Sequence, residues 1–141
     1  MENLRIGVVG YSAQKFDIAT ANSLLYSAFD YISMHYPNRP IEIVSGLTLY
    51  GIPKLAYEAA FVLGYSTRGI APECAVTMPC WDCDEVTIVG KTWGDESETF
   101  LNSIDILLRI GGGKQSHEET NIAKSMGIVT MELELDIQEN E

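Results

Sequence analysis

Short apolar runs alternate with segments of helical periodicity along this chain of 141 residues. Six runs have the length and composition of buried β-strands and lie at residues 4–9, 41–44, 66–70, 85–89, 106–110 and 128–131. Strands that are apolar at consecutive positions are typical of a parallel sheet covered on both faces. We therefore predict one α/β domain over residues 1–141, with an open parallel sheet of about six strands and helices on both faces.

Helix signals occupy four of the segments between these runs. The first helix is expected to begin after Asp17, whose carboxylate can cap it, and the second carries Pro53 in its first turn and stops at Gly64. Two later helices are expected to open with capping boxes, in which a glutamate returns the hydrogen bond of the capping side chain: Asp95 with Glu98, and Ser116 with Glu119. The acidic end after the last strand, about residues 134–141, is expected to fray.

The composition fits a globular domain and limits its partners. Hydrophobic residues make up 46% of the chain and charged residues 21%, which provides enough apolar material for one core. Nine Lys and Arg residues against twenty Asp and Glu residues give a net charge of −11. A charge of this sign argues against binding to nucleic acid or to an anionic membrane surface, although backbone amides can still hold a small anion.

The absence of targeting signals and the odd number of cysteines favour a cytoplasmic protein. No metal is expected. No apolar run reaches the ~20 residues of a membrane span, and the first residues do not resemble a signal peptide. The cysteines, Cys74, Cys80 and Cys83, are odd in number, which favours free thiols in a reducing compartment. A zinc site that adds His35 or His117 is the alternative. Only Cys80 and Cys83 have the spacing of zinc ligands, so no metal is expected.

Three strand-to-helix turns combine glycine with hydroxyl side chains, at the places where open α/β sheets bind ligands. Glycine lets the backbone approach a phosphate closely, and Ser and Thr add hydrogen-bond donors. The candidate ligand-binding residues are Gly10, Tyr11 and Ser12 in the first turn, Ser45, Gly46, Leu47 and Thr48 in the second, and Gly111, Gly112, Gly113, Lys114, Gln115, Ser116 and His117 in the third. The third turn is the strongest candidate, because consecutive glycines follow an apolar strand and precede a helix. A tight turn without a ligand, with His117 as a solvated helix residue, is the alternative.

The third turn matches neither common nucleotide-binding motif. The segment from Gly111 to Ser116 lacks the last glycine of the dinucleotide-binding fingerprint, and Gln115 stands where a Walker loop has the Ser or Thr that holds magnesium. We therefore expect a phosphate or carboxylate site of another kind. Trp81 and Trp93 are interpreted as packing residues rather than as platforms that stack on a base.

Four segments carry a family resemblance: residues 45–51, 57–60, 69–72 and 105–119. Together they resemble the LOG-type Rossmann-like nucleotide-binding superfamily, which includes proteins long mistaken for lysine decarboxylases, DprA-like DNA-uptake proteins and cytokinin-activating phosphoribohydrolases. The resemblance implies a Rossmann-like domain, a nucleotide or similar small phosphorylated ligand, and a homodimer. The better-known enzymes of this group hydrolyse nucleoside monophosphates to free base and ribose phosphate.

The family's motif Pro-Gly-Gly-x-Gly-Thr-x-x-Glu falls on residues 111–119. Gly112, Gly113, Ser116 and Glu119 keep the motif or its chemistry, whereas Gly111 replaces the proline and Gln115 replaces a glycine. The resemblance implies that Glu119 is the catalytic residue, which polarises the ribose or acts on a water. The alternative role for Glu119 is structural, as the partner of Ser116 in the capping box.

One departure from the family leaves the activity open. In the phosphoribohydrolases an Arg-Lys pair stands before the glycine motif, and it falls here on Glu96 and Ser97, which reverses the charge. Arg109 is the nearest arginine in sequence but lies inside a predicted strand. Two hypotheses follow: a nucleotide N-glycosidase, or a non-catalytic nucleotide sensor or carrier on the same fold. An interaction protein whose glycines serve only turns is a third, and no cofactor is expected.

Overall fold

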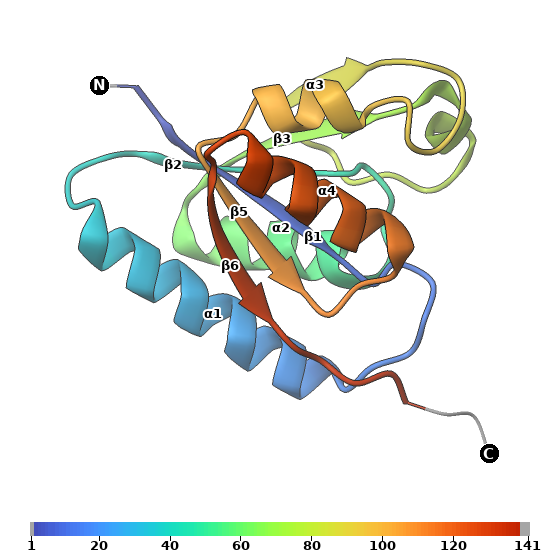
Figure 1. Cartoon of the computed structure of the whole chain (residues 1–141). Coiled ribbons are helices and arrows are strands. Elements are labelled where there is room, and N and C mark those ends of the chain that lie inside the picture. The colour runs from blue at the N-terminus through green and yellow to red at the C-terminus, as the bar shows by residue number, and fades with distance from the viewer. Residues whose placement is uncertain (1, 139–141) are drawn as a thin grey trace.

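Six parallel strands form one sheet in the computed structural model, which describes residues 2–138 (Figure 1). The strands are β1 (Leu4–Gly10), β2 (Ile41–Ser45), β3 (Ser66–Ala71), β4 (Glu85–Ile88), β5 (Ile106–Ile110) and β6 (Val129–Leu133). Their order in the sheet is β4-β3-β2-β1-β5-β6, and every neighbouring pair runs parallel. The predicted open α/β sheet is therefore confirmed.

The helices cover both faces of the sheet, in pairs. They are α1 (Ile18–His35), α2 (Gly51–Leu63), α3 (Ser97–Asn102) and α4 (Lys114–Ser125), and a short 3-10 helix follows β3 at Glu73–Thr77. Alternate residues of β1 separate the two sides of the core, because Val8 packs with α1 and α2 whereas Val9 packs with α3 and α4. Figure 1 shows α1 and α2 on one side of the sheet and α3 and α4 on the other.

The chain reverses its direction of winding between β1 and β5. From β1 it adds β2, β3 and β4 on one side, and it then returns to place β5 and β6 on the other side. The helices that follow β1 and β5 consequently leave from the same edge of the sheet toward opposite faces. Open α/β sheets bind ligands at such a reversal, outside the carboxyl ends of the strands.

Two helix starts differ from the prediction. The first two helices are confirmed: the Asp17 carboxylate accepts the Thr20 N–H at 3.0 Å, and Gly64 ends α2 with a φ of +77°. In contrast, α3 begins only at Ser97, because the Asp95 carboxylate caps the preceding turn through the N–H groups of Lys91 and Thr92.

The capping box predicted at Ser116 is also wrong. The fourth helix begins at Lys114 with Gly113 as its N-cap, and neither Ser116 nor Glu119 caps it. Both side chains are instead buried on the inner face of α4.

The edge strands and the C-terminal segment also depart from expectation. Val86 of β4 and Val129 of β6 are more than half exposed, because an edge strand lacks a neighbour that would cover its outer side. After β6 the chain is held rather than frayed as far as residue 138. Buried Arg109 donates to the Glu134 carboxylate at 2.6 Å, and Leu135 packs into the core. Residues 139–141 of the expected frayed end lie outside the described residues.

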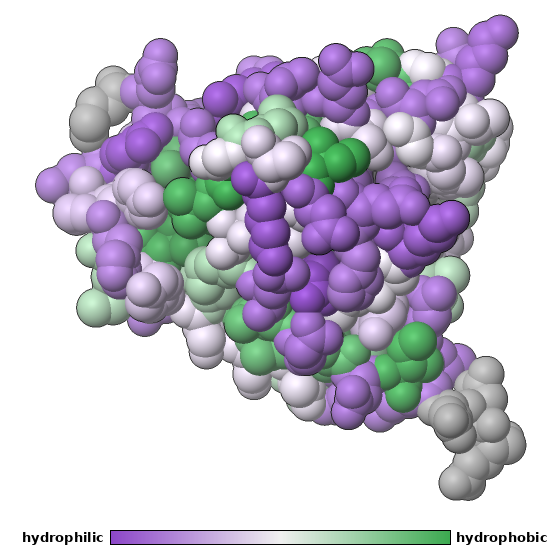
Figure 2. Space-filling view, viewed as in Figure 1, coloured by the Kyte–Doolittle hydropathy of each residue, from purple (hydrophilic) through white to green (hydrophobic). Residues whose placement is uncertain are grey.

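Within residues 2–138, no helix is long and apolar enough to cross a bilayer, and no group of three His, Cys, Asp or Glu side chains could hold a metal ion. Cys74, Cys80 and Cys83 are free thiols. Figure 2 shows a mostly hydrophilic surface over α4, with separate small hydrophobic spots around it.

Replacing Gly10 tests the close contact at the reversal. A Cβ there would lie 2.4 Å from the Ile110 carbonyl oxygen and 2.7 Å from Cγ1 of Ile52, so Gly10→Ala must displace backbone. We expect a loss of ~1–3 kcal/mol in the free energy of unfolding, measured by urea denaturation. The control is Gly46→Ala, whose Cβ would meet no atom within 4 Å and should change stability by less than about 0.5 kcal/mol. Equal effects of the two substitutions would contradict this account of the reversal.

Candidate functional site

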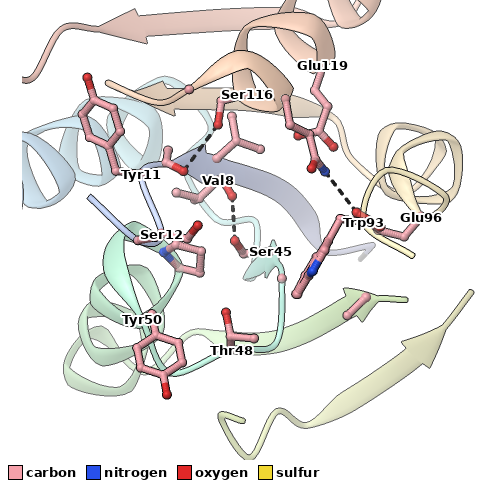
Figure 3. A pocket seen from close by; sticks show the side chains of 18 of the residues that line it. Val8, Tyr11, Ser12, Ser45, Thr48, Tyr50, Trp93, Glu96, Ser116 and Glu119 are labelled. Atoms are coloured by element: carbon pink, nitrogen blue, oxygen red, sulfur yellow. Dashed lines mark hydrogen bonds between the residues drawn. The ribbon is translucent and has the colours of Figure 1, made fainter. Parts of the chain in front are cut away.

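A pocket of about 650 Å³ lies at the carboxyl ends of β1, β2 and β3, beside the start of α4 (Figure 3). This volume falls within the range of small-molecule sites. Its walls come from the turns after β1, β2 and β5, and from the connection between β4 and α3. The pocket therefore occupies the place where the winding reverses.

The structure brings most of the predicted site residues together around this pocket. The lining residues among them are Gly10, Tyr11, Ser12, Ser45, Gly46, Thr48, Gly113, Lys114, Gln115, Ser116 and Glu119. Four candidates do not line it: Leu47, Gly111, Gly112 and His117. Leu47 is buried in the core against Gly69, as its apolar side chain requires, and His117 is exposed on the outer side of α4.

Gly111 and Gly112 act on the pocket indirectly, through the shape of the turn. Their φ values are +57° and +106°, a region that other residues rarely adopt. A Cβ on Gly111 would lie 2.4 Å from the Tyr11 ring, and one on Gly112 would lie 2.6 Å from Cβ of Ser116. The glycines thus let the turn pack against Tyr11 and bring the start of α4 to the pocket.

The start of α4 gives the pocket an electropositive border. Gly113, Lys114, Gln115 and Ser116 line the cavity, and N–H groups in the first turn of a helix have no partner within that helix. The helix dipole adds partial positive charge at the same place. This arrangement favours a phosphate, sulfate or carboxylate group of a ligand.

Among the pocket hydroxyls that have no partner within residues 2–138, that of Thr48 belongs to the most buried residue. Ser45 donates to the Val8 carbonyl at 2.6 Å, and Ser116 makes a longer contact of 3.4 Å to the Gly10 carbonyl. Thr48 is 7% exposed and lines the pocket, yet its hydroxyl takes part in no hydrogen bond within the described chain. Figure 3 shows Thr48 directed toward the interior of the cavity. A hydroxyl that faces the cavity and has no protein partner is available to a ligand.

A pair of glutamates lies on the other side of the pocket from Tyr11 and Ser12 (Figure 3). Glu96 is 6% exposed and Glu119 is 7% exposed. Ser97 donates to Oε2 of Glu119 at 2.9 Å, and the Gln115 amide donates to Oε1 of Glu96 at 3.0 Å. Both oxygens of Glu96 also accept the Gly94 N–H at 3.2 Å.

Burial and a like charge alter the acidity of Glu119. Removal from water, reinforced by the neighbouring Glu96 charge, raises the pKa of the Glu119 carboxyl to about 7, against the opposing effect of the Ser97 hydrogen bond. Glu119 therefore exchanges a proton near neutral pH. Groups with such a pKa can bind ligands in a pH-dependent way or act in acid–base chemistry.

The sequence analysis missed two features of this wall. Trp93, interpreted as a packing residue, lines the pocket and is 54% exposed, whereas Trp81 does stack on buried Tyr57. Glu96, which stands where the phosphoribohydrolases have an arginine, also lines the pocket. The connection between β4 and α3 is itself a strand-to-helix turn, so its position at the same edge of the sheet was the available signal.

Arg109 does not take the place of the arginine found in the phosphoribohydrolases. Its guanidinium donates to the Gly111 carbonyl at 2.6 Å and to Glu134, and it does not line the pocket. Lys114 is the one Lys or Arg residue on the walls of the cavity as far as the structure describes the chain. The pocket thus combines an electropositive helix end with an acidic wall.

No protein-family model and no curated protein matches the chain. Similarity to solved structures is clear. A molybdenum cofactor binding protein from the phototrophic bacterium Rippkaea orientalis superposes with a TM-score of 0.77 at 20% identity, over 96% of this chain and 79% of that one. The molybdenum cofactor carrier protein from Chlamydomonas reinhardtii gives 0.73 at 18% identity, over 93% and 76%.

A third similar structure is that of TM1055, solved by X-ray diffraction as a structural-genomics target. Its TM-score is 0.71 at 18% identity, over 90% of this chain and 72% of TM1055. At these identities the likeness establishes the fold. The chain has the single-domain, Rossmann-like α/β fold of these proteins.

Proposed function

We propose that this protein is a non-catalytic carrier or sensor that binds a small phosphorylated ligand in the pocket at the reversal of winding. The observation that carries the proposal is the pairing of the α4 N-terminus with the unpartnered Thr48 hydroxyl across one cavity of about 650 Å³. The helix end would hold the anionic group, and the hydroxyl would bind a second polar group of the ligand.

The similar structures favour a carrier over an enzyme. Two of them are named for carrying or binding the molybdenum cofactor, which makes this cofactor one candidate ligand beside nucleotides. The acidic residue at position 96 points the same way, because the phosphoribohydrolases have an arginine where this chain has Glu96. A buried carboxylate there cannot stabilise a developing negative charge as an arginine would.

Hydrolysis of an N-glycosidic bond is the second candidate function. The favouring observation is the position of Glu119 on the pocket wall with a pKa of about 7. A carboxyl that titrates near neutral pH could protonate a leaving base or orient a water.

The homodimer and the cytoplasmic location remain predictions. Sedimentation velocity would test whether the protein forms a dimer.

Ligand binding should depend on Thr48. We expect a thermal-shift screen of nucleoside mono-, di- and triphosphates, NAD, ADP-ribose and the molybdenum cofactor to find a ligand that raises Tm, since a ligand at about 100 times its Kd adds about 2.7 kcal/mol. Thr48→Val should raise the Kd of that ligand about 10-fold, because the substitution removes one hydrogen bond. Its stability without ligand should stay unchanged, because the hydroxyl has no protein partner.

The matched control for this prediction is Thr130→Val on β6, which removes a hydroxyl outside the pocket. Its affinity should equal that of the unmodified protein in calorimetric titration. Unchanged affinity in Thr48→Val, or an absence of any binding ligand, would contradict the proposed site.

Stability should report the titration of Glu119. A carboxyl whose pKa is higher in the folded than in the unfolded state costs stability as pH rises from about 4.5 through about 7, and this loss is complete once both states are ionised. Glu119→Gln removes this titration, so the variant should gain roughly 2 kcal/mol relative to the unmodified protein between about pH 5 and pH 8. Urea denaturation at both pH values measures the difference, and parallel pH profiles would refute the raised pKa.

Release of base separates the two candidate functions. After incubation with nucleoside monophosphates for hours, chromatography should detect no free base if the protein is a carrier or sensor. Should the protein release base, a loss of about 100-fold in turnover in Glu119→Gln would identify an enzyme that uses this carboxyl. Equal turnover in the two proteins would exclude Glu119 as the catalytic residue.

A further inference from the structure

The acidic wall of the pocket has no cation to balance it. Within residues 2–138, neither Glu96 nor Glu119 forms an ion pair with Lys, Arg or His. The lysine of the pocket, Lys114, instead points to Glu118 at 3.8 Å and is 90% exposed in its side chain. A buried carboxylate needs hydrogen-bond donors, and in the described part of the chain these are Ser97, Gln115 and Gly94.

These donors leave part of the Glu119 carboxylate free to accept further hydrogen bonds. The Ser97 hydroxyl donates to Oε2 of Glu119, and a hydrogen bond from the Gln115 side chain also lowers the pKa of Glu119. An ionised carboxylate has about four acceptor sites, so these two donors do not fill it. The side chain is nine-tenths buried and lines the pocket. A ligand that presents N–H groups to this wall would complete the donor set, whereas an acceptor or an anion would be repelled.

A flat aromatic surface lies next to the glutamates. Trp93 and Phe100 both line the cavity, and Figure 3 shows the Trp93 ring beside Glu96. Planar heterocycles stack on such rings while their edges form hydrogen bonds in the plane. The wall therefore offers stacking and edge recognition together.

We propose that Glu96 and Glu119, held by Gln115 and Ser97, recognise an edge of adjacent N–H donors on a planar heterocycle of the guanine type, stacked on Trp93. This inference rests on the proposed function and names the part of the ligand that is remote from its phosphate. The phosphate would accept from the backbone N–H groups at the start of α4, and the heterocycle would lie against the two carboxylates and Trp93.

Guanosine and inosine monophosphates test this inference because they differ only by the amino group at the purine 2-position. Calorimetric titration at pH 7.5 should give a Kd at least about 10-fold lower for guanosine monophosphate, the discrimination expected of a bidentate contact. In Glu96→Gln this preference should fall to less than about 3-fold, with little change for inosine monophosphate. The control, Glu98→Gln, makes the same charge change on an exposed residue of α3 and should keep the full preference.

Trp93→Leu separates stacking from edge recognition. This variant should raise the Kd of both mononucleotides about 10-fold and leave the ratio of the two Kd values unchanged, because every base presents a flat face for stacking. The assignment would be overturned if the ratio of the two Kd values changed in Trp93→Leu but not in Glu96→Gln.

The failures of the two proposals are distinguishable. Equal affinity for the two mononucleotides, or a preference that survives Glu96→Gln, overturns the guanine-type edge while the phosphorylated-ligand site stands. Failure of both to bind at millimolar concentration also overturns this inference. Only if, in addition, no phosphorylated compound of the screen raises Tm does the proposed function fail with it.

Discussion

The pairing of β1 with β5 is the constraint on which the fold and its pocket both depend. These two central strands run side by side in parallel, with Gly10 in register with Ile110. The chain winds outward from β1 in one direction and from β5 in the other, so the connections that follow them diverge to opposite faces. Side chains cannot fill the space between diverging connections, and the pocket lies there.

The α4 helix contributes both free N–H groups and a titratable carboxyl to the pocket because of where it begins. Starting at Lys114, it presents its first turn to the cavity and places Ser116, Glu119, Thr120 and Ala123 on one buried face. Had it begun at a Ser116 cap, Glu119 would have hydrogen-bonded to the backbone at the helix end. Its carboxyl instead meets Ser97 from α3 and is removed from water, which raises its pKa to about 7. One shift in the helix start thus gives the pocket its titratable group.

The strands and the first two helices could be predicted from the sequence because their signals are local. Consecutive apolar residues marked the strands, and the Asp17 cap and the Gly64 stop are contacts within one turn. Both capping boxes failed for the opposite reason, since a carboxylate chooses among donors that only the folded chain brings near. Asp95 caps the turn before it, and Glu119 reaches Ser97 on another helix.

The turns that form the site could also be predicted, but the orientation of single side chains could not. Leu47 lies between pocket residues in sequence and yet faces the core. Trp93 and Glu96 come from the connection between β4 and α3, where Gly90, Thr92 and Gly94 repeat the glycine and hydroxyl pattern of the other turns, and the sheet order brings this connection to the pocket. The tie between Arg109 and Glu134 joins a central strand to a segment expected to fray, which depends on the course of the chain after β6.

The claim that the start of α4 holds an anion is tested most directly by nuclear magnetic resonance. Inorganic phosphate would be titrated into isotopically labelled protein at constant ionic strength, with chloride as the balancing salt, while the backbone amide signals are followed. The account predicts saturable shifts that are largest at Lys114, Gln115 and Ser116, because their N–H groups would donate to the phosphate. The absence of saturable shifts at these residues, or larger ones at residues remote from the pocket, would contradict it.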